Sequence, residues 1–349
     1  MFMTTKHWLN LGMLALLALF LWGAGRWADE YQVRLLNNVA VFITLAVSYN
    51  LINGVCGQFH LGPNAFITLG AYTAALLTMT PGEKAVNFLI TPLYWPLSQI
   101  ALPFPLALLA GGLVAAAFGF LTGFPVFRVR GDYLAIVTLG FGEVVRVLAN
   151  NLQGLTNGPL GLKGLHPYTD LWWSWGVAVA TVAFIAALVN SDYGRALKAI
   201  RDDETAARAM GLDTFRHLLL AYILSAFFFG VGGGLLAHLI TTISPSLFTF
   251  FLTFNLLIII VVGGLGSTTG AVVSAVFFTL AGEWLRVVEE PQVLLGLNIP
   301  GIPGMRMVIF SFLLLLVILY FRRGLLGGRE FTWDGLRRVW GRFFKYHAS

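Results

Sequence analysis

The sequence has little cysteine and lacks a phosphate-binding motif. Cys56 is the single cysteine among 349 residues, which excludes an intramolecular disulfide framework and a metal cluster built on cysteines. No Gly-Lys dipeptide occurs, so the G-x-x-x-x-G-K-[ST] loop and ATP hydrolysis through it are excluded. The six histidines include no pair at metal-ligand spacing, and no catalytic cluster is visible. We therefore expect neither an enzyme nor a metal site.

Charged residues are also scarce, and apolar residues dominate. Only 11% of the residues are charged and 58% are hydrophobic, a composition outside the range of ordinary soluble domains. Apolar runs recur along almost the whole chain, and no polar segment is long enough to bury a core of its own. We predict an all-α, polytopic transmembrane helical bundle that forms one integral membrane domain over residues 1–349 and contacts membrane lipid.

About ten apolar runs approach the roughly 20 residues that a helix needs to cross about 30 Å of hydrocarbon. The first could be mistaken for a secretory signal peptide, but we expect it to be retained as a span. The runs are Leu9–Ala24, Leu35–Asn53, Leu61–Met79, Ile100–Thr122, Tyr133–Asn150, Trp172–Val189, His217–Ile240, Thr249–Gly264, Thr269–Val287 and Met305–Phe321.

The placement of basic residues predicts the orientation, because short cytoplasmic loops accumulate Lys and Arg. With both termini cytoplasmic, the inner segments hold fifteen of the 22 basic residues, and the reverse orientation would place those fifteen outside. We therefore expect a cytoplasmic loop at 192–216 and a cytoplasmic C-terminal tail at 322–349. Topology then accounts for the net charge of +6, and no nucleic-acid partner is needed.

The stretch GRALKAIRDDETAARAMG, from Gly194 to Gly211, places seven charges in eighteen residues of this loop. Asp192 is a suitable N-cap for a short helix along the membrane surface, and Gly211 suits its C-terminal end because glycine tolerates positive φ. One side of this helix would be apolar except for Glu204. The apolar side consists of Leu197, Ile200, Ala207 and Met210.

Two interpretations of this stretch are open. Charge runs in loops are usually solvated connectors that only fix topology. Here acidic and basic residues are balanced, and small residues allow another backbone to approach, which favours docking of a soluble partner. The candidate docking residues are Gly194, Arg195, Lys198, Arg201, Asp202, Asp203, Glu204, Ala206, Ala207, Met210 and Gly211.

Several motifs resemble those of a known transporter family. The pattern Glu204-x-Ala206-Ala207-x-x-x-Gly211 resembles the coupling loop of ABC-transporter permeases, which fits a groove on an ATPase subunit. Together with four other motifs, it resembles the permease subunits of branched-chain amino acid ABC importers, from about Asn37 to Arg323. The related urea and amide importers share this architecture. The other motifs are GQFHLGPNAFITLGAYTAALL (57–77), GDYLAIVTLGFGEVVRVLANN (131–151), TNGPLGL (156–162) and SPSLFTFFLTFNLLIIIVVGGLGSTTGAV (244–272).

The resemblance implies a transport subunit in a bacterial inner membrane, working by alternating access. Its implied partners are two ATPase subunits that bind ATP and Mg²⁺, a second and related permease, and an extracytoplasmic solute-binding protein. This chain departs from the family in two places. Its loop lacks the usual Ile-x-Leu-Pro ending, and His60 and Pro63-Asn64 stand where most relatives carry Ser and a His-Ala pair. Roles of those side chains are therefore not transferred.

Ionisable residues inside apolar runs are costly and mark candidate sites. Glu143 and Arg146 are three residues apart and are expected to form an ion pair, which either fixes helix packing or lies on the translocation path or its gate. Glycines and a proline at 57–63 predict either a broken helix that lines the path or a capped helix start. The candidate pathway residues are Asn53, Gln58, Asn64, Thr68, Glu143, Arg146 and Asn150.

A second charged group lies near the outer end of the ninth run. Glu283 and Arg286 repeat the three-residue spacing, and Glu289 and Glu290 follow. They form either an interfacial salt-bridge cluster or a docking rim for the binding protein.

The sequence therefore favours a permease subunit of an ABC importer for branched-chain amino acids. One alternative is a permease of a urea or amide importer. Another is a secondary transporter driven by an ion gradient, which would use the Glu143–Arg146 pair for coupling but would leave the charged loop unexplained.

Overall fold

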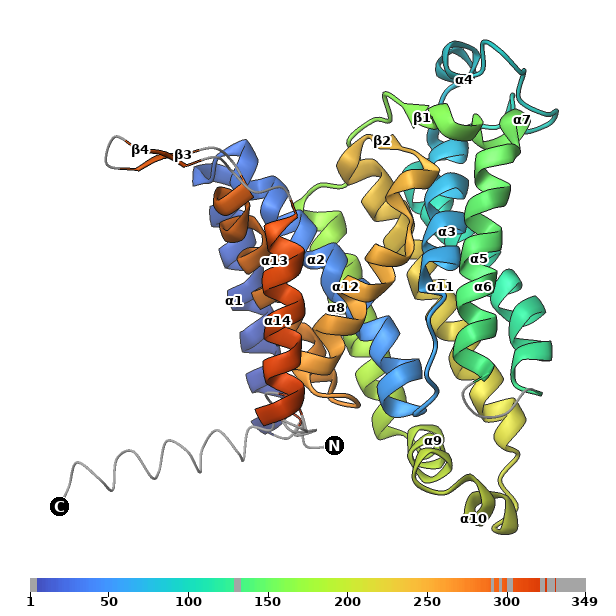
Figure 1. Ribbon diagram of the computed structural model, residues 1–349, viewed down its shortest axis with the longest axis vertical. Helices are drawn as coiled ribbons and strands as arrows, with labels where there is room; N and C mark the ends of the chain where they lie inside the picture. Colours follow the sequence, from blue (N-terminus) through green and yellow to red (C-terminus); the bar gives the residue numbers. More distant parts are fainter. Residues whose placement is uncertain are drawn as a thin grey trace.

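Long helices form most of the described chain, which is residues 5–128, 133–289, 292–294, 297–299, 304–320, 324 and 330 of a computed structural model. Within these residues, ten helices have 14 or more residues and pack into one bundle (Figure 1). They are α1 (Thr5–Trp27), α2 (Glu30–Asn50), α3 (Pro63–Thr78), α5 (Phe104–Val126), α6 (Tyr133–Asn151), α8 (Leu171–Asn190), α11 (Thr214–Ile240), α12 (Phe250–Gly263), α13 (Thr268–Glu289) and α14 (Met305–Tyr320).

The remaining elements are short and lie at the ends of the bundle. The short helices are α4 (Pro81–Asn87), α7 (Gln153–Thr156), α9 (Asp192–Asp202), α10 (Glu204–Ala209), a π-helical turn η1 (Leu51–Val55), and the 3₁₀ turns η2 (Gly158–Leu160) and η3 (Pro245–Leu247). Two antiparallel strand pairs join β1 (Leu162–Lys163) to β2 (Thr242–Ile243) and β3 (Gln292–Leu294) to β4 (Leu297–Ile299). The predicted all-α class is confirmed.

Seven stretches of the described chain are long and apolar enough to cross a membrane. The other three predicted runs coincide with α1, whose apolar part is Leu11–Trp27, and with α3 and α14, which have 16 residues each. The number of spans therefore stays a prediction. The seven stretches are Glu30–Val55, Phe104–Val126, Tyr133–Asn151, Leu171–Asn190, Thr214–Ile240, Pro245–Gly263 and Thr268–Arg286.

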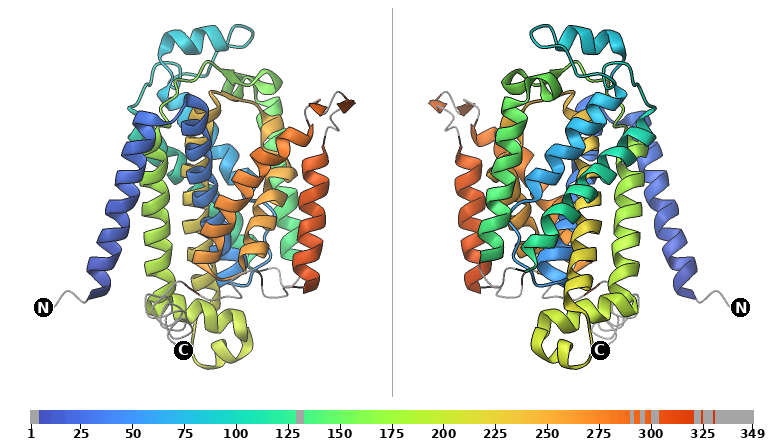
Figure 2. Two further views of the ribbon diagram at one scale, coloured as in Figure 1. Left: turned by 90° about the vertical axis from the view of Figure 1, so that its left-hand side faces the viewer. Right: turned by 90° about the vertical axis from the view of Figure 1, so that its right-hand side faces the viewer.

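The two ends of the bundle differ. α9 and α10 project from one end, which we call the coupling end, whereas α4 and the β1–β2 pair cover the opposite end (Figures 1 and 2). α1 begins and α14 ends at the coupling end (Figure 1). This arrangement agrees with the prediction that the loop at 192–216 and both termini lie on one side, but it does not test the orientation in a membrane. Within the predicted tail at 322–349, only residues 324 and 330 are described.

The centre of the bundle is formed where α3, α5 and α11 approach closely. A Cβ placed on Gly70 of α3 would lie 2.1 Å from the Gly230 carbonyl oxygen of α11. A Cβ on Gly230 would lie 2.6 Å from the Gly111 carbonyl oxygen of α5, and one on Gly111 would lie 2.9 Å from the Gly70 carbonyl oxygen. Small residues allow such backbone contact between membrane helices, where van der Waals packing drives association.

One pass through the bundle is interrupted. α2 continues into η1, and the chain then runs without helix from residue 57 to 62 before α3 begins at Pro63 (Figure 1). We call residues 57–62 the extended leg; six such residues can cover up to about 20 Å. His60 and Gly62 in the leg are buried. The structure has a non-helical break at 57–62, and α3 is short because the leg replaces its first turns. That the leg lines the translocation path stays a prediction.

We expect Gly70→Ala to lower the thermal stability of the purified protein, by about 1–3 kcal/mol, because the added methyl group must force α3 away from the Gly230 carbonyl. Gly140→Ala is the matched control, because nothing lies within 4 Å of a Cβ at Gly140 of α6. Unfolding monitored by size-exclusion chromatography after heating checks this. Equal midpoints for Gly70→Ala and Gly140→Ala would contradict the close packing.

Candidate functional site

The predicted docking helix is two helices, α9 and α10. Ser191 is the N-cap of α9, because its Oγ accepts from the Gly194 N–H at 3.3 Å, so the prediction of Asp192 as N-cap is wrong. Asp203 has extended backbone (φ −157°), and its Oδ1 accepts from the N–H groups of Thr205 and Ala206, both at 2.9 Å. Because this side chain caps α10, it ends α9, and the single helix predicted over 194–211 is wrong.

The two helices bury an apolar side and expose a charged one. Leu197, Ile200 and Ala207 of the predicted apolar side are buried, but Met210, which was predicted on the same side, is 84% exposed. Gly211 ends the segment with φ +85°, as expected of its position. The exposed charges pair along the surface as Arg195 with Asp192, Arg201 with Asp202, Arg208 with Glu204 and Arg216 with Asp213. Internal pairing explains why acidic and basic residues are balanced here.

Arg201 connects the exposed helix pair to the bundle. Its Nη1 donates to the Gly54 carbonyl of η1 at 3.4 Å, and its side chain packs against Gly57 at the start of the extended leg. The Asn50 Oδ1 accepts from the Gly266 N–H at 2.9 Å, which joins the end of α2 to the turn between α12 and α13. A Cβ at Gly266 would lie 3.1 Å from Arg201 Nη1. We call Asn50, Gly54, Gly57, Arg201 and Gly266 the Arg201 junction.

A second contact fixes α9 to α11. The Tyr193 hydroxyl donates to the His217 carbonyl at 2.5 Å, and the two rings stack with centroids 4.9 Å apart. Burial raises the pKa of Tyr193 above its ordinary value. The phenol therefore stays protonated and available as a donor at neutral pH.

Side chains hold the backbone of the extended leg. The His60 carbonyl accepts from the Tyr49 hydroxyl at 2.6 Å and from Asn53 Nδ2 at 3.4 Å, and the His60 N–H donates to Asn53 Oδ1 at 3.3 Å. The Leu61 N–H donates to Thr138 Oγ1 of α6 at 3.0 Å. Non-helical backbone at membrane depth is tolerated where such partners replace the missing helical bonds. Asn53 therefore has a structural role that its sequence position did not reveal.

Buried polar atoms surround the leg. Thr68 Oγ1 donates to the Asn64 carbonyl at 2.6 Å, and Asn64 Nδ2 donates to the Phe248 carbonyl at 3.4 Å. Within the described part of the chain, both ring nitrogens of His60 and the Asn64 Oδ1 are buried without a hydrogen-bond partner. Such groups are costly in an apolar interior, which makes this region unusual for a purely structural core.

The predicted pathway residues divide into two groups. Asn53, Asn64 and Thr68 are buried together around the leg. The others are partly or fully exposed. Glu143 and Arg146 form the predicted ion pair at 2.7 Å, with side chains 37% and 35% exposed. The exposed group is Gln58, Glu143, Arg146 and Asn150.

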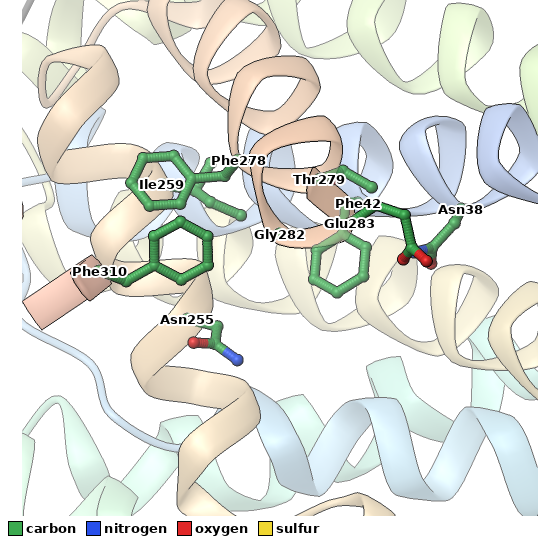
Figure 3. A pocket seen from close by; sticks show the side chains of 9 residues that line it. All are labelled: Asn38, Phe42, Asn255, Ile259, Phe278, Thr279, Gly282, Glu283 and Phe310. Carbon is green, nitrogen blue, oxygen red and sulfur yellow. The ribbon is translucent and has the colours of Figure 1, made fainter. Parts of the chain in front are cut away.

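The charged group near the end of α13 contacts a neighbouring helix and borders a cavity. Glu283 pairs with Arg286 at 3.1 Å and accepts from the Tyr31 hydroxyl of α2 at 2.6 Å. Glu289 ends α13, and Glu290 lies outside the described residues. Glu283 also lines a cavity of about 220 Å³ together with Asn38, Phe42, Asn255, Phe278 and Phe310 (Figure 3).

Sequence reasoning missed Asn38 and Asn255, although an amide inside an apolar run is a usable signal. Among the described residues, no three His, Cys, Asp or Glu side chains come together to hold a metal ion.

A bundle of apolar helices with seven stretches long enough to cross a membrane, a broken pass and a charged helix pair at one end has the features of a multi-pass membrane protein. The family described as branched-chain amino acid transport system, permease component, matches residues 31–319. The chain belongs to this family, whose members are transport subunits.

Two curated relatives are 35% identical to it in an alignment of 289 residues that covers 73% of this chain and 64% of theirs. Both are named high-affinity branched-chain amino acid transport system permease protein LivM, one from Salmonella typhimurium and one from Escherichia coli. A probable branched-chain amino acid transport permease protein LivM of Methanocaldococcus jannaschii is 22% identical in an alignment of 230 residues that covers 61% of this chain and 66% of that protein. The chain spans 64% of the length of the two bacterial relatives. No solved structure matches it.

We expect Asp203→Ala to speed amide hydrogen exchange at Thr205 and Ala206, because both N–H groups lose their acceptor. Loss of such a cap destabilises a helix by about 1 kcal/mol, which is several-fold in the opening equilibrium. Asp213→Ala is the control, because Asp213 caps α11 at Arg216 and should leave α10 unaffected. Equal exchange at Thr205 in Asp203→Ala and the unmodified protein would contradict the cap.

Proposed function

We propose that this chain is a permease subunit that imports branched-chain amino acids across a bacterial inner membrane, driven by ATP hydrolysed on partner subunits. The family match over residues 31–319 and the printed names of the relatives support this proposal. In the proposed topology the ten long helices are ten spans. The coupling end, with both termini, the loop at 192–216 and the tail at 322–349, faces the cytoplasm. The whole chain then forms one permease domain.

The exposed pair α9–α10 is proposed to dock into an ATPase subunit. The observation that supports this proposal most directly is the Arg201 junction. There α9, which projects from the bundle, contacts η1 and the start of the extended leg. A shift of α9 would move the Arg201 guanidinium against the Gly54 carbonyl and the Gly266 turn. That displacement would reach η1, the extended leg and the start of α13 together. Alternating access needs such a link between ATP binding and the membrane helices.

The other proposed partners follow from the family. Two ATPase subunits would bind ATP and Mg²⁺, and a second, related permease would complete the pathway. A solute-binding protein would dock at the end opposite α9, where Glu283, Arg286, Glu289 and Glu290 are proposed as its rim. The buried residues Asn53, Asn64 and Thr68 around the leg are proposed as part of the path or gate, and Gln58, Glu143, Arg146 and Asn150 as residues that border it.

Two alternatives are distinguished by experiment. A urea or amide importer would share the architecture but not the substrate. A secondary transporter would need an ion site, and the direct pairing of Glu143 with Arg146 at 2.7 Å does not favour one there.

The proposed activity predicts ATP-driven uptake by the assembled complex. Proteoliposomes that contain the chain with its ATPases, second permease and loaded binding protein should accumulate leucine, isoleucine and valine when ATP is enclosed. Urea and acetamide should not compete. Accumulation by this chain alone on an imposed proton or sodium gradient, without ATP, would contradict the proposal.

The junction predicts that Arg201→Gln lowers uptake about tenfold while the complex still assembles, because the shorter neutral side chain cannot keep contact with Gly54. ATP hydrolysis should persist but should no longer be linked to transport. Arg128→Gln is the control, since Arg128 lies over the Phe124 ring outside the docking segment. Uptake per ATP hydrolysed, compared between the two variants, measures the effect. Equal ratios would argue against transmission through Arg201.

A further inference from the structure

Two adjoining cavities lie beside α2 and α13, one bounded also by α12 and α14 and the other by the end of α11. The first, of about 220 Å³, is lined by Asn38, Phe42, Asn255, Phe278, Glu283 and Phe310, among others (Figure 3). The second, of about 380 Å³, has Tyr31, Arg34 and Arg286 in its wall and shares Asn38 and Glu283 with the first. We call the two together the α2–α13 cleft. Their combined size falls in the range of about 300–1,000 Å³ typical of small-molecule sites.

The cleft runs from the end of the bundle opposite α9 toward the middle. At 1.5 Å per residue, Glu283 lies about 9 Å and Phe278 about 16 Å from the end of α13 at Glu289. A helix of 22 residues is about 33 Å long, so Phe278 is close to its midpoint. The charged residues therefore lie toward the surface, and the aromatic rings lie near mid-depth, where transporters commonly place their substrate.

The charged part of the cleft contains one carboxylate and two guanidinium groups. Glu283, whose side chain is 23% exposed, is held by Arg286 at 3.1 Å and by the Tyr31 hydroxyl at 2.6 Å. Arg34 forms no ion pair with any described residue, and it lines the same cavity. Glu283 balances only one of the two positive charges that line the cleft, those of Arg34 and Arg286. An incoming carboxylate would neutralise the other charge, and the Glu283 oxygens would accept from an ammonium group.

The deeper part of the cleft is apolar. The rings of Phe278 and Phe310 lie with their centroids 4.9 Å apart, and Phe42 faces the same cavity. The amides of Asn38 and Asn255 lie along the wall as well, with Asn38 beside Glu283 (Figure 3). A ligand with two opposite charges at one end and an apolar group at the other would satisfy both parts of the cleft.

We propose that the α2–α13 cleft binds one zwitterionic α-amino acid with an apolar side chain as it enters the permease. Arg34 holds its carboxylate, Glu283 holds its ammonium group, and Phe42, Phe278 and Phe310 surround its side chain. Tyr31 positions the Glu283 carboxylate. This inference rests on the proposed function and adds an entry site that differs from the leg and from the Glu143–Arg146 pair. In the Glu143–Arg146 pair each charge balances the other, whereas the cleft holds Arg34 in addition to the Glu283–Arg286 pair.

Labelling of an introduced thiol tests the cleft directly in the assembled complex. The native Cys56 is buried and serves as a silent background. In Asn255→Cys, a positively charged methanethiosulfonate reagent should react from the outside, and added leucine should slow the reaction several-fold. Leu89→Cys is the control, since Leu89 is 81% exposed and should react equally with and without leucine.

Three outcomes separate this inference from the proposed function. If unmodified complex transports leucine but leucine does not slow the labelling of Asn255→Cys, the cleft proposal fails and the function stands. If Asn255→Cys reacts only with a lipid-soluble maleimide, the cleft faces lipid and the proposal also fails. If the complex does not transport leucine but leucine still slows the labelling, the cleft proposal stands and the proposed function fails.

Uptake by charge variants provides the second measurement. Glu283→Gln and Arg34→Gln should each lower leucine uptake about tenfold or more at saturating binding protein, because each removes one charge partner of a desolvated zwitterion. Glu30→Gln and Arg26→Gln are controls: Glu30 begins α2, Arg26 lies over Trp22, and neither lines the cleft. Equal yield of assembled complex shows that the variants fold. Unchanged uptake in both Glu283→Gln and Arg34→Gln would overturn the proposal.

Discussion

The constraint on which this structure depends is that backbone groups inside a bilayer have no water to bond. Helices meet this constraint along the long passes, but at the extended leg the chain enters the bundle without the regular hydrogen bonds of a helix, and the Gln58 N–H donates to the Ile52 carbonyl of η1. Tyr49, Asn53 and Thr138 supply the missing partners from α2, η1 and α6. The leg is therefore held by side chains of its neighbours, and any movement of those neighbours acts on it directly.

The extended leg lies between the coupling end and the proposed entry site, and contacts lead from it toward both. The Arg201 junction reaches the leg through Gly54 and Gly57 from the coupling end. α12 follows the η3 turn, and the Phe248 carbonyl between them accepts from Asn64 just after the leg. The same α12 contributes Asn255 to the α2–α13 cleft. The segment of Phe248 and α12 thus contacts the broken pass at Asn64 and lines the proposed entry site at Asn255, so the two regions share one element.

Sequence alone predicted the features that the bilayer imposes. The ten apolar runs coincide with ten helices, because each must satisfy its own backbone, and the glycines and proline at 57–63 predicted the break. The Glu143–Arg146 pair was also predictable, because helical spacing brings the two side chains together. A single helix was predicted through Asp203, but its side chain accepts from the N–H groups of Thr205 and Ala206 and so starts a second helix. The spacing of apolar residues does not reveal such a cap.

The α2–α13 cleft could not be predicted, because its charged and amide residues are distributed over α2, α12 and α13. Arg34 and Asn38 are four residues apart and share a face of α2, but no spacing relates them to Asn255 or Glu283, and only the packing of these helices brings the four together. The Arg201 junction is hidden for the same reason, because Gly54 and Arg201 are 147 residues apart. The local sequence pattern identifies single helices. A site formed between helices can be found only when the packing of those helices is known.

The division at Asp203 has a consequence for the evolution of partner choice. α9 is fixed to the bundle through Leu197, Ile200 and Tyr193, whereas α10 buries only Ala207. Substitutions on α10 therefore disturb few internal contacts, and those on α9 disturb the link to the membrane helices. Under the proposed function, recognition of an ATPase subunit and transmission of its movement could thus change separately, so that a duplicated permease could acquire a new partner and keep its transport mechanism.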